Sequence, residues 1–378
     1  MNMKKNIFCA LLLVAVMLFC LYGCVEKPSE ESNVGEIQTE KDDFSAAVDD
    51  GESSTLGKEY QRCADLAQTK DGFVTADAHL FEYEEIDGGL RITKYKGEYE
   101  LLSLPDSING KAVVSIGKEA FAANRWLAAV VLPDSIKNVE SLAFYGCTNL
   151  CYVDLGDGKK TVENYAFSNC PSLFSIDLTS AESIGKGALF ACGSIHDITV
   201  SFVGGQPDEN TFIGYIFGAE TADHNAEFVP ESLRRITLSD ECKTIPDRAF
   251  SNCRYLTEVV IPDSVGSIGV RAFAYCRSIA ELDVGKGTEI ICDDAFFGCD
   301  NLKKITLSES LKSLGMQAFF GCDKLEEINM PATLSEIKPS TFYGCKSLKN
   351  IDLTNVKTIG KDAFYGSQIL LETADAEK

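Results

Sequence analysis

Cysteine and histidine are the residue types in this chain best suited to catalysis or metal binding, with fifteen and three copies. Zinc sites usually need Cys-x-x-Cys pairs or closely spaced histidines, and neither pattern occurs. His196 precedes Asp197, but adjacent residues on a strand face opposite ways. The nucleophile-elbow, metalloprotease, phosphate-loop and dinucleotide-binding patterns are also missing from the sequence. We therefore predict no catalytic residues, no metal and no cofactor.

Eight cysteines follow one register instead. They are separated by 22 or 23 residues, except for one longer interval: Cys147, Cys170, Cys192, Cys253, Cys276, Cys299, Cys322 and Cys345. In stacked coils, equivalent side chains run parallel about 4.8 Å apart, whereas a disulfide needs Cβ atoms about 3.8 Å apart on converging vectors. We therefore predict a column of buried free thiols, each of which acts as a small hydrophobic side chain.

A repeat must position these cysteines. Three consecutive 23-residue units display it: RYLTEVVIPDSVGSIGVRAFAYC, RSIAELDVGKGTEIICDDAFFGC and DNLKKITLSESLKSLGMQAFFGC. Their shared features are a strand-like Leu-x-x-Val-x-Ile stretch, a turn such as Pro-Asp-Ser, a second short extended piece and an Ala-Phe pair that turns the chain back. The Phe of each unit should join a spine inside the stack.

The period predicts a repeat solenoid made mostly of short β-strands and turns. Eleven coils follow from the strand centres, which are Leu102, Val130, Val153, Ile176, Ile198, Ile236, Val259, Leu282, Ile305, Ile328 and Ile351. At about 4.8 Å per strand, the stack should be roughly 50 Å long. Ile198 and Ile236 are 38 residues apart, so one irregular long coil is expected at 201–232.

The pattern resembles the BspA-like leucine-rich repeat family. The resemblance rests on the Leu-x-x-Ile-x-Leu-Pro strands, the Ile-Gly pairs such as Ile268-Gly269, and the Ala-Phe-x-x-Cys endings, and it covers about Phe73 to the C-terminus. It implies a leucine-rich repeat solenoid over 73–378. Residues 73–113 would form an N-terminal β-hairpin cap and the first strand. The family also implies surface display and adhesion-type binding.

The N-terminus has the features of a secretion signal. Lys4 and Lys5 precede an uncharged apolar run, which predicts a signal peptide over 1–23. Leu-Tyr-Gly-Cys at its end resembles the bacterial lipobox, although Tyr22 is bulkier than usual there. The resemblance implies that Cys24 is lipidated, which would anchor the chain at the cell surface. A plain signal peptide or an uncleaved anchor is the alternative. Residues 24–72 then begin with a strongly acidic stretch, read as a disordered tether.

Three surfaces are candidates for binding a partner. The first is a stripe of outward strand residues: Asp154, Asp177, Thr199, Thr237, Asp283, Thr306, Asn329 and Asp352. The second is an aromatic row that includes Phe297, Phe320 and Tyr343, and the third is the long coil with Phe212, Tyr215 and Phe217. Each has a structural alternative: a solvated sheet face, a minor core over the turns, or aromatics packed on the solenoid flank.

The formal net charge of −22 argues against a nucleic-acid partner. Secretion, a repeat scaffold and no catalytic pattern together predict a non-enzymatic surface lipoprotein. We expect it to adhere to host or neighbouring-cell components by binding a protein. The alternatives are a carbohydrate-binding module, for which the aromatic row would serve, and a spacer without a ligand. Membrane contact is expected only through the N-terminal lipid.

Overall fold

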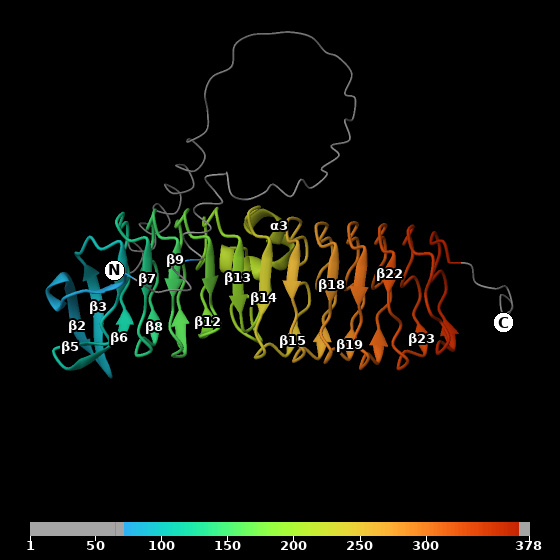
Figure 1. Cartoon of the computed structure of the whole chain (residues 1–378), viewed down its shortest axis with the longest axis horizontal. Coiled ribbons are helices and arrows are strands. Elements are labelled where there is room, and N and C mark those ends of the chain that lie inside the picture. Colours follow the sequence, from blue (N-terminus) through green and yellow to red (C-terminus); the bar gives the residue numbers. More distant parts are fainter. Residues whose placement is uncertain (1–64, 66–71, 370–378) are drawn as a thin grey trace, which may run out of the picture. The chain divides into compact units, whose positions relative to one another are not determined.

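The computed structural model describes residue 65 and residues 72–369. These residues belong to one compact unit, Glu52–Lys378. The predicted signal peptide, Cys24 and nearly all of the predicted tether lie outside the described residues. Within them, the chain winds into a stack of about twelve coils (Figure 1). No helix among them has the length and apolar character needed to cross a bilayer.

One column of short parallel strands contains the predicted strand centres. Its members are β1 (Val74–Thr75), β4 (Leu101–Ser103), β7 (Ala129–Val131), β9 (Tyr152–Asp154), β11 (Ser175–Asp177), β13 (Asp197–Val200), β14 (Arg235–Leu238), β16 (Glu258–Val260), β18 (Glu281–Asp283), β20 (Lys304–Thr306) and β22 (Glu327–Ile328). Ile198, Ile236 and Val259 are aligned partners. The prediction of eleven coils missed the one at β1, which pairs with β4. Around Ile351 the chain follows the coil without a regular strand.

A second column runs along the other side of the coils. It comprises β6 (Lys111–Ile116), β8 (Asn138–Val139), β10 (Lys160–Val162), β12 (Ala181–Ile184), β15 (Thr244–Ile245), β17 (Ser267–Ile268), β19 (Ile290–Ile291), β21 (Ser313–Leu314), β23 (Glu336–Ile337) and β24 (Thr358–Ile359). At the N-terminal end, β2 (Phe81–Ile86) pairs antiparallel with β3 (Gly89–Tyr95), and β5 (Ser107–Ile108) pairs antiparallel with β6. The predicted β-hairpin cap is therefore confirmed, and its β3 joins the column by pairing parallel with β6.

The Ala-Phe turns close each coil and form the predicted spine. Consecutive buried rings lie 4.8–5.4 Å apart between centroids, in one run from Tyr95 to Phe167 and a second from Phe250 to Phe364. The residue before each Ala-Phe pair has a positive φ, for example Asp294 at 58° and Gln317 at 53°. A left-handed residue is costly for side chains other than glycine, and sequence reasoning did not foresee this turn.

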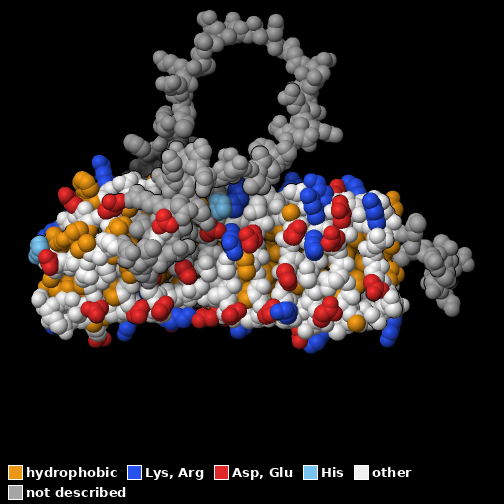
Figure 2. Space-filling model, viewed as in Figure 1, with side chains coloured by type: hydrophobic (Ala, Val, Ile, Leu, Met, Phe, Trp, Pro, Cys, Tyr) orange, Lys and Arg blue, Asp and Glu red, His pale blue; other side chains and the backbone are white. Residues whose placement is uncertain are grey.

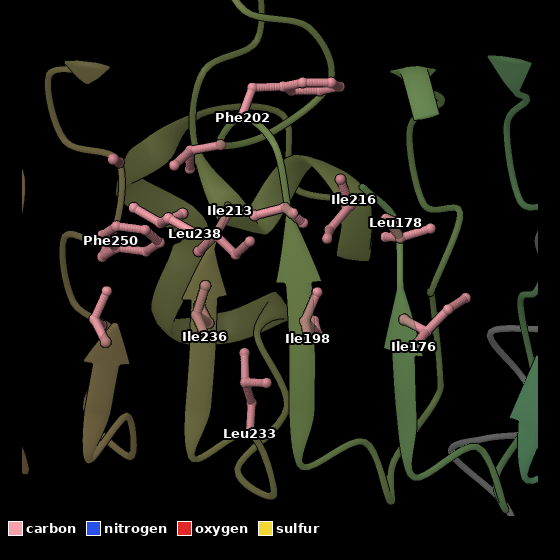
Figure 3. Close-up of a cluster of buried hydrophobic side chains, with 14 of the residues drawn as sticks. Ile176, Leu178, Ile198, Phe202, Ile213, Ile216, Leu233, Ile236, Leu238 and Phe250 are labelled. Carbon is pink, nitrogen blue, oxygen red and sulfur yellow. The ribbon is translucent and has the colours of Figure 1, made fainter. Parts of the chain in front are cut away.

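The long coil interrupts the second column between β12 and β15. Its chain folds into 3-10 helices η2 (Ile213–Phe217) and η3 (Ala222–His224) and a single helical turn, α3 (Asn225–Phe228). Figure 3 shows Ile213 of this coil beside Leu238, and Phe202, Ile213 and Ile216 belong to the same buried cluster as the strand residues Ile198, Ile236 and Leu238. Apolar side chains of the long coil thus fill the interior where a regular coil would place a second strand.

Candidate functional site

The cysteine column is a structural feature of the interior. All eight cysteines are buried and free. In seven of them the S–H donates to the carbonyl of a Phe in the preceding coil at 3.1–3.2 Å, as in Cys299 to Phe273. Burial raises the pKa of Cys192, Cys299 and Cys345 to about 12. At neutral pH these thiols are protonated, so they offer no nucleophile.

His196 and Asp197 depart from the sequence expectation. The two side chains were expected on opposite faces, yet His196 Nδ1 lies 3.1 Å from Asp197 Oδ2. His196 stands just before β13, where strict alternation does not yet apply, and its ring stacks on Phe174 at 5.2 Å. No three His, Cys, Asp or Glu side chains in the described part of the chain come together as a metal site.

The predicted outward stripe runs along the first strand column. Asp177, Asp283, Thr306 and Asp352 are exposed, whereas Asp154, Thr199, Thr237 and Asn329 are partly buried. The four aspartates each accept the backbone N–H two residues ahead through Oδ1 at 2.8–2.9 Å, which fixes the turn after the strand. Asn329 bonds both backbone groups of Leu307 and so replaces a ladder pair where β22 ends. Turn chemistry therefore accounts for part of the stripe's composition.

Three stripe residues share a groove, which we call the notch. It has a volume of about 780 Å³ and is open to solvent. Asp154, Asp177 and Thr199 line it, whereas the other five stripe residues do not. Tyr152, Ser175 and Asp197, each at the start of a strand, add to its polar lining. The rest of the polar lining comes from the turns beyond the strands, namely Asp157, Lys159, Thr179, Ser180, Ser201, Ser239, Asp240 and Glu241.

Differences in turn length explain the notch. Val162 follows Val153 by nine positions, and Ile245 follows Ile236 by nine. In the two intervening coils this distance falls to eight, from Ile176 to Ile184 and from Ile198 to Gln206, because the N–H of Ile184 donates to the carbonyl of Gly205, the residue before Gln206. Two short turns therefore lie between two long ones. The long turns supply the walls, with Asp157 and Lys159 on one side and Asp240 and Glu241 on the other.

A single ion pair crosses the notch. Lys159 Nζ lies 2.8 Å from Glu241 Oε2 and 3.3 Å from the carbonyl oxygen of Thr179. The pair joins residues that are 82 positions apart. The hydrogen bond and charge of Lys159 lower the pKa of Glu241. Because both side chains are largely exposed, this pair contributes little to stability, and it leaves most of the notch open.

Lys160 holds the Lys159 wall in place from below. Lys160 lies two residues before the buried Val162 in β10, so strand alternation turns it into the interior, where it is 1% exposed, and the partner strand β12 has one extra residue opposite this point. Its ammonium donates to the carbonyl oxygens of Gly156, at 3.3 Å, and Gly158. Burial lowers the pKa of Lys160, while Asp134, Asp154 and Asp157 oppose that shift. This residue was not singled out from the sequence; the available signal was a lysine two positions before the inward aliphatic residue Val162.

The aromatic row is a continuous stack at the C-terminal end of the solenoid. Ring centroids of Phe297 and Phe320 are 4.8 Å apart, those of Phe320 and Tyr343 4.7 Å, and those of Tyr343 and Tyr365 4.9 Å. The interplanar angle is 2° in the first two pairs. Because each inner ring packs both faces against neighbours, its edge alone meets solvent. Sugars bind aromatic rings through their faces, so this geometry favours a packing role for the row.

The three residues of the long coil that were predicted to bind a partner differ in their exposure to solvent. Phe217 is 2% exposed and lies in the core, so it presents no surface for a partner. Phe212 is partly buried and meets Tyr215 edge-to-face at 6.0 Å. Tyr215 lines a smaller cavity of about 270 Å³ beside Glu163 and Asn164. The coil is held inward by Asn225, which is fully buried: its Oδ1 accepts the Gly214 N–H at 2.9 Å and its Nδ2 donates to the Ser251 carbonyl at 3.0 Å.

Parallel strands in register, an aliphatic interior and a turn of fixed design in each coil define a leucine-rich repeat solenoid. The sequence matches the model of the BspA type leucine rich repeat region in six copies, over residues 98–214, 224–289 and 266–375. The chain therefore belongs to the BspA-type leucine-rich repeat family. The matching family model indicates no enzyme family.

Similar solved structures include a leucine-rich repeat protein from Bacteroides ovatus, at 21% identity and a TM-score of 0.45, with 79% of this chain and 81% of that chain covered. A leucine rich cell surface protein from Faecalibacterium prausnitzii is 23% identical, with a TM-score of 0.32 and coverage of 79% and 87%. The pneumococcal vaccine antigen PcpA is 20% identical, with a TM-score of 0.33 and coverage of 79% and 80%. Comparison with curated proteins finds no match.

Proposed function

We propose that this protein is displayed on the bacterial surface and binds a protein partner through the outward stripe, as an adhesin for host or neighbouring cells. The notch carries the proposal, because it brings Asp154, Asp177 and Thr199 together in a solvent-filled groove of about 780 Å³. Solenoids commonly bind partners along such extended faces. Membership of a family that includes a cell surface protein supports display.

Anchoring would follow from lipidation of Cys24. In cells that express the full chain, we expect labelled fatty acid on the wild-type protein and its recovery with the membrane fraction. Cys24→Ala should carry no label, because it lacks the thiol that is acylated. A labelled Cys24→Ala protein would contradict lipidation at this residue.

To test adhesion, cells that display the full chain are allowed to attach to surfaces, each coated with one extracellular-matrix protein, and the number of attached cells is measured. Asp154→Ala/Asp177→Ala/Thr199→Ala should reduce attachment at least about tenfold, as expected when contacts at the centre of an interface are lost. The matched control is Asp283→Ala/Thr306→Ala/Asp352→Ala, which alters the same stripe outside the notch. Equal attachment by wild type and the notch variant would contradict the site assignment.

A carbohydrate partner is the second candidate from the sequence. The face-to-face packing of Phe297, Phe320 and Tyr343 weakens it, since the inner rings have no free face. A protein partner is therefore the function that the arrangement of the surface supports best.

A further inference from the structure

The notch has the size and position of a built recognition site. Its volume of about 780 Å³ falls within the range of roughly 300–1,000 Å³ that is usual for ligand sites. It also depends on two adjacent short turns, which occur together at this one place among the described coils. The question is which chemistry this groove would accept.

The charge of the lining answers part of that question. Six carboxylates line the notch, and Lys159 is the one lysine or arginine among the lining residues. Within the described residues, no ion pair joins Asp157, Asp177 or Asp240 to a lysine or arginine, although Asp157 interacts electrostatically with the buried Lys160. Figure 2 shows acidic side chains with basic ones interspersed on the face in view, and ion pairs such as Lys286 with Asp263 at 3.1 Å join some of the charges of the solenoid. The notch is set apart by the gathering of six carboxylates and one lysine in a single groove.

The contacts of the Lys159 ammonium group indicate how the notch would hold a cation from a partner. Lys159 Nζ lies between the Glu241 carboxylate and the Thr179 carbonyl oxygen. Thr179 also accepts the Ser201 hydroxyl at 2.9 Å, so a fixed acceptor forms the floor. A cationic side chain that enters from solvent would meet the same kind of acceptors at Asp157, Asp177 and Asp240.

Spacing indicates what would carry such cations. The notch crosses the coils from β9 to β14, a distance of roughly 15 Å at about 4.8 Å per strand. Alternate side chains of an extended polypeptide are about 7 Å apart on one face. Two or three basic side chains would therefore span the notch, and arginine can engage a carboxylate through two hydrogen bonds.

We propose that the notch binds an extended segment of the partner protein that carries arginine or lysine at alternate positions. The inference rests on the proposed function, since it names the partner chemistry of the same surface. Lys159 then acts as a built-in competitor: it occupies Glu241 and reduces the negative charge that an incoming segment meets.

The experiment measures binding of a fluorescein-labelled peptide, Gly-Arg-Ser-Arg-Ser-Arg, to the full-length protein by anisotropy at about 0.1 M salt, where charges more than about 10 Å apart are screened. Asp157→Asn/Asp240→Asn should weaken binding at least about tenfold, because it removes one carboxylate from each wall. Lys159→Gln should strengthen binding at least about threefold, because it frees Glu241. A peptide with glutamine in place of each arginine should not bind.

Matched controls separate the notch from the overall acidity. Asp106→Asn/Asp362→Asn and Lys286→Gln make the same charge changes elsewhere and should leave the affinity within about twofold of wild type. Equal weakening in the Asp106/Asp362 variant would overturn the site in favour of diffuse attraction. Displacement of the peptide by spermidine at equal charge concentration would overturn a polypeptide ligand in favour of a small cation.

This experiment and the adhesion experiment can fail separately. Absence of peptide binding, with attachment that still depends on Asp154, Asp177 and Thr199, would overturn the basic-segment proposal alone. Peptide binding at the notch, with attachment unaffected by the notch variant, would overturn the adhesion assignment and leave the cationic site standing.

Discussion

At the scale of single residues, the cysteine thiols stabilise this solenoid because their hydrogen bonds join one coil to the next. Each of the seven hydrogen-bonded cysteines donates to a Phe carbonyl of the preceding coil, and the Phe side chains stack beside it. Cys253 follows the long coil and has no such carbonyl beneath it among the described residues. The last regular coil carries Ser367 at this position, and its hydroxyl donates to Phe364 within the same coil at 2.8 Å.

These thiols should make stability depend on alkaline pH. Burial raises the pKa of Cys299 to about 12, whereas a thiol in the unfolded chain ionises near 8.5. The stabilisation from the folded thiol is complete below about pH 8.5 and is lost as pH rises towards 12, because the unfolded state releases the proton first. Urea unfolding at pH 7, 9 and 10 should show a falling free energy of unfolding. Cys299→Ala should show a shallower fall, by up to about 1.4 kcal/mol per pH unit; identical slopes would contradict this account.

The long coil shows how one element departs from the repeat while keeping the core filled. Ile213 and Ile216 are fully buried, as a second strand's inward residues would be. The Asn225 side chain provides hydrogen bonds that a strand ladder would otherwise have made, since it accepts from the Gly214 N–H and donates to the Ser251 carbonyl. The sequence left open whether the aromatic residues of this coil bind a partner or pack on the solenoid flank. Phe217 is buried, which agrees with packing, whereas Tyr215 is partly exposed beside a cavity.

Loss of Asn225 should loosen this element selectively. Asn225→Ala leaves the Gly214 N–H and Ser251 carbonyl buried without partners, at a cost of about 1–3 kcal/mol for each group. Hydrogen exchange should accelerate at residues 211–229 and remain slow in coils several positions away, because repeats contact only their neighbours. The exposed Asn355→Ala serves as control, with a change below about 0.5 kcal/mol. Uniform loss of protection along the chain would contradict a local role.

At the scale of the whole molecule, the solenoid is a sum of similar coils and their interfaces. Residues 277–299 make up one full 23-residue unit between Cys276 and Asp300. Because Leu282 and Ile305 are register partners, removal of this unit brings the equivalent residues of the next coil into the same place.

Deletion of 277–299 should therefore leave a folded protein with native-like circular dichroism and a cooperative, slightly lower unfolding temperature. One complete coil, that of β16, separates the notch from the deleted unit, so attachment to the coated surface should persist, because each coil contacts only its neighbours. Deletion of 288–299 is the matched control, since it removes half a coil and shifts every later strand out of register. Equal folding of the two deletion variants would contradict a repeat-based register.

The sequence by itself determined the period, the strand centres, the free-thiol column and the Phe spine. These follow from local alternation repeated every 23 residues, and each error in register would misplace an apolar side chain. The N-terminal cap was predicted from the resemblance to the family and not from the period. The extra coil at β1 was not predicted, because a strand of two residues, Val74 and Thr75, is too short to display the period. The left-handed backbone at residues such as Gln317 was not predicted either. The turn imposes this conformation, and the residue types found at that position do not indicate it.

Tertiary structure decided which outward residues form a site. Two successive turns that are each one residue shorter are visible in the sequence, but only stacking places these turns between longer ones and opens the notch. Stacking likewise brings Lys159 to Glu241, and the alternation of β10 places Lys160 in the interior beneath them. The eight predicted stripe residues share one chemical pattern, yet three of them line the notch, because a groove depends on the heights of neighbouring turns and not on any single coil.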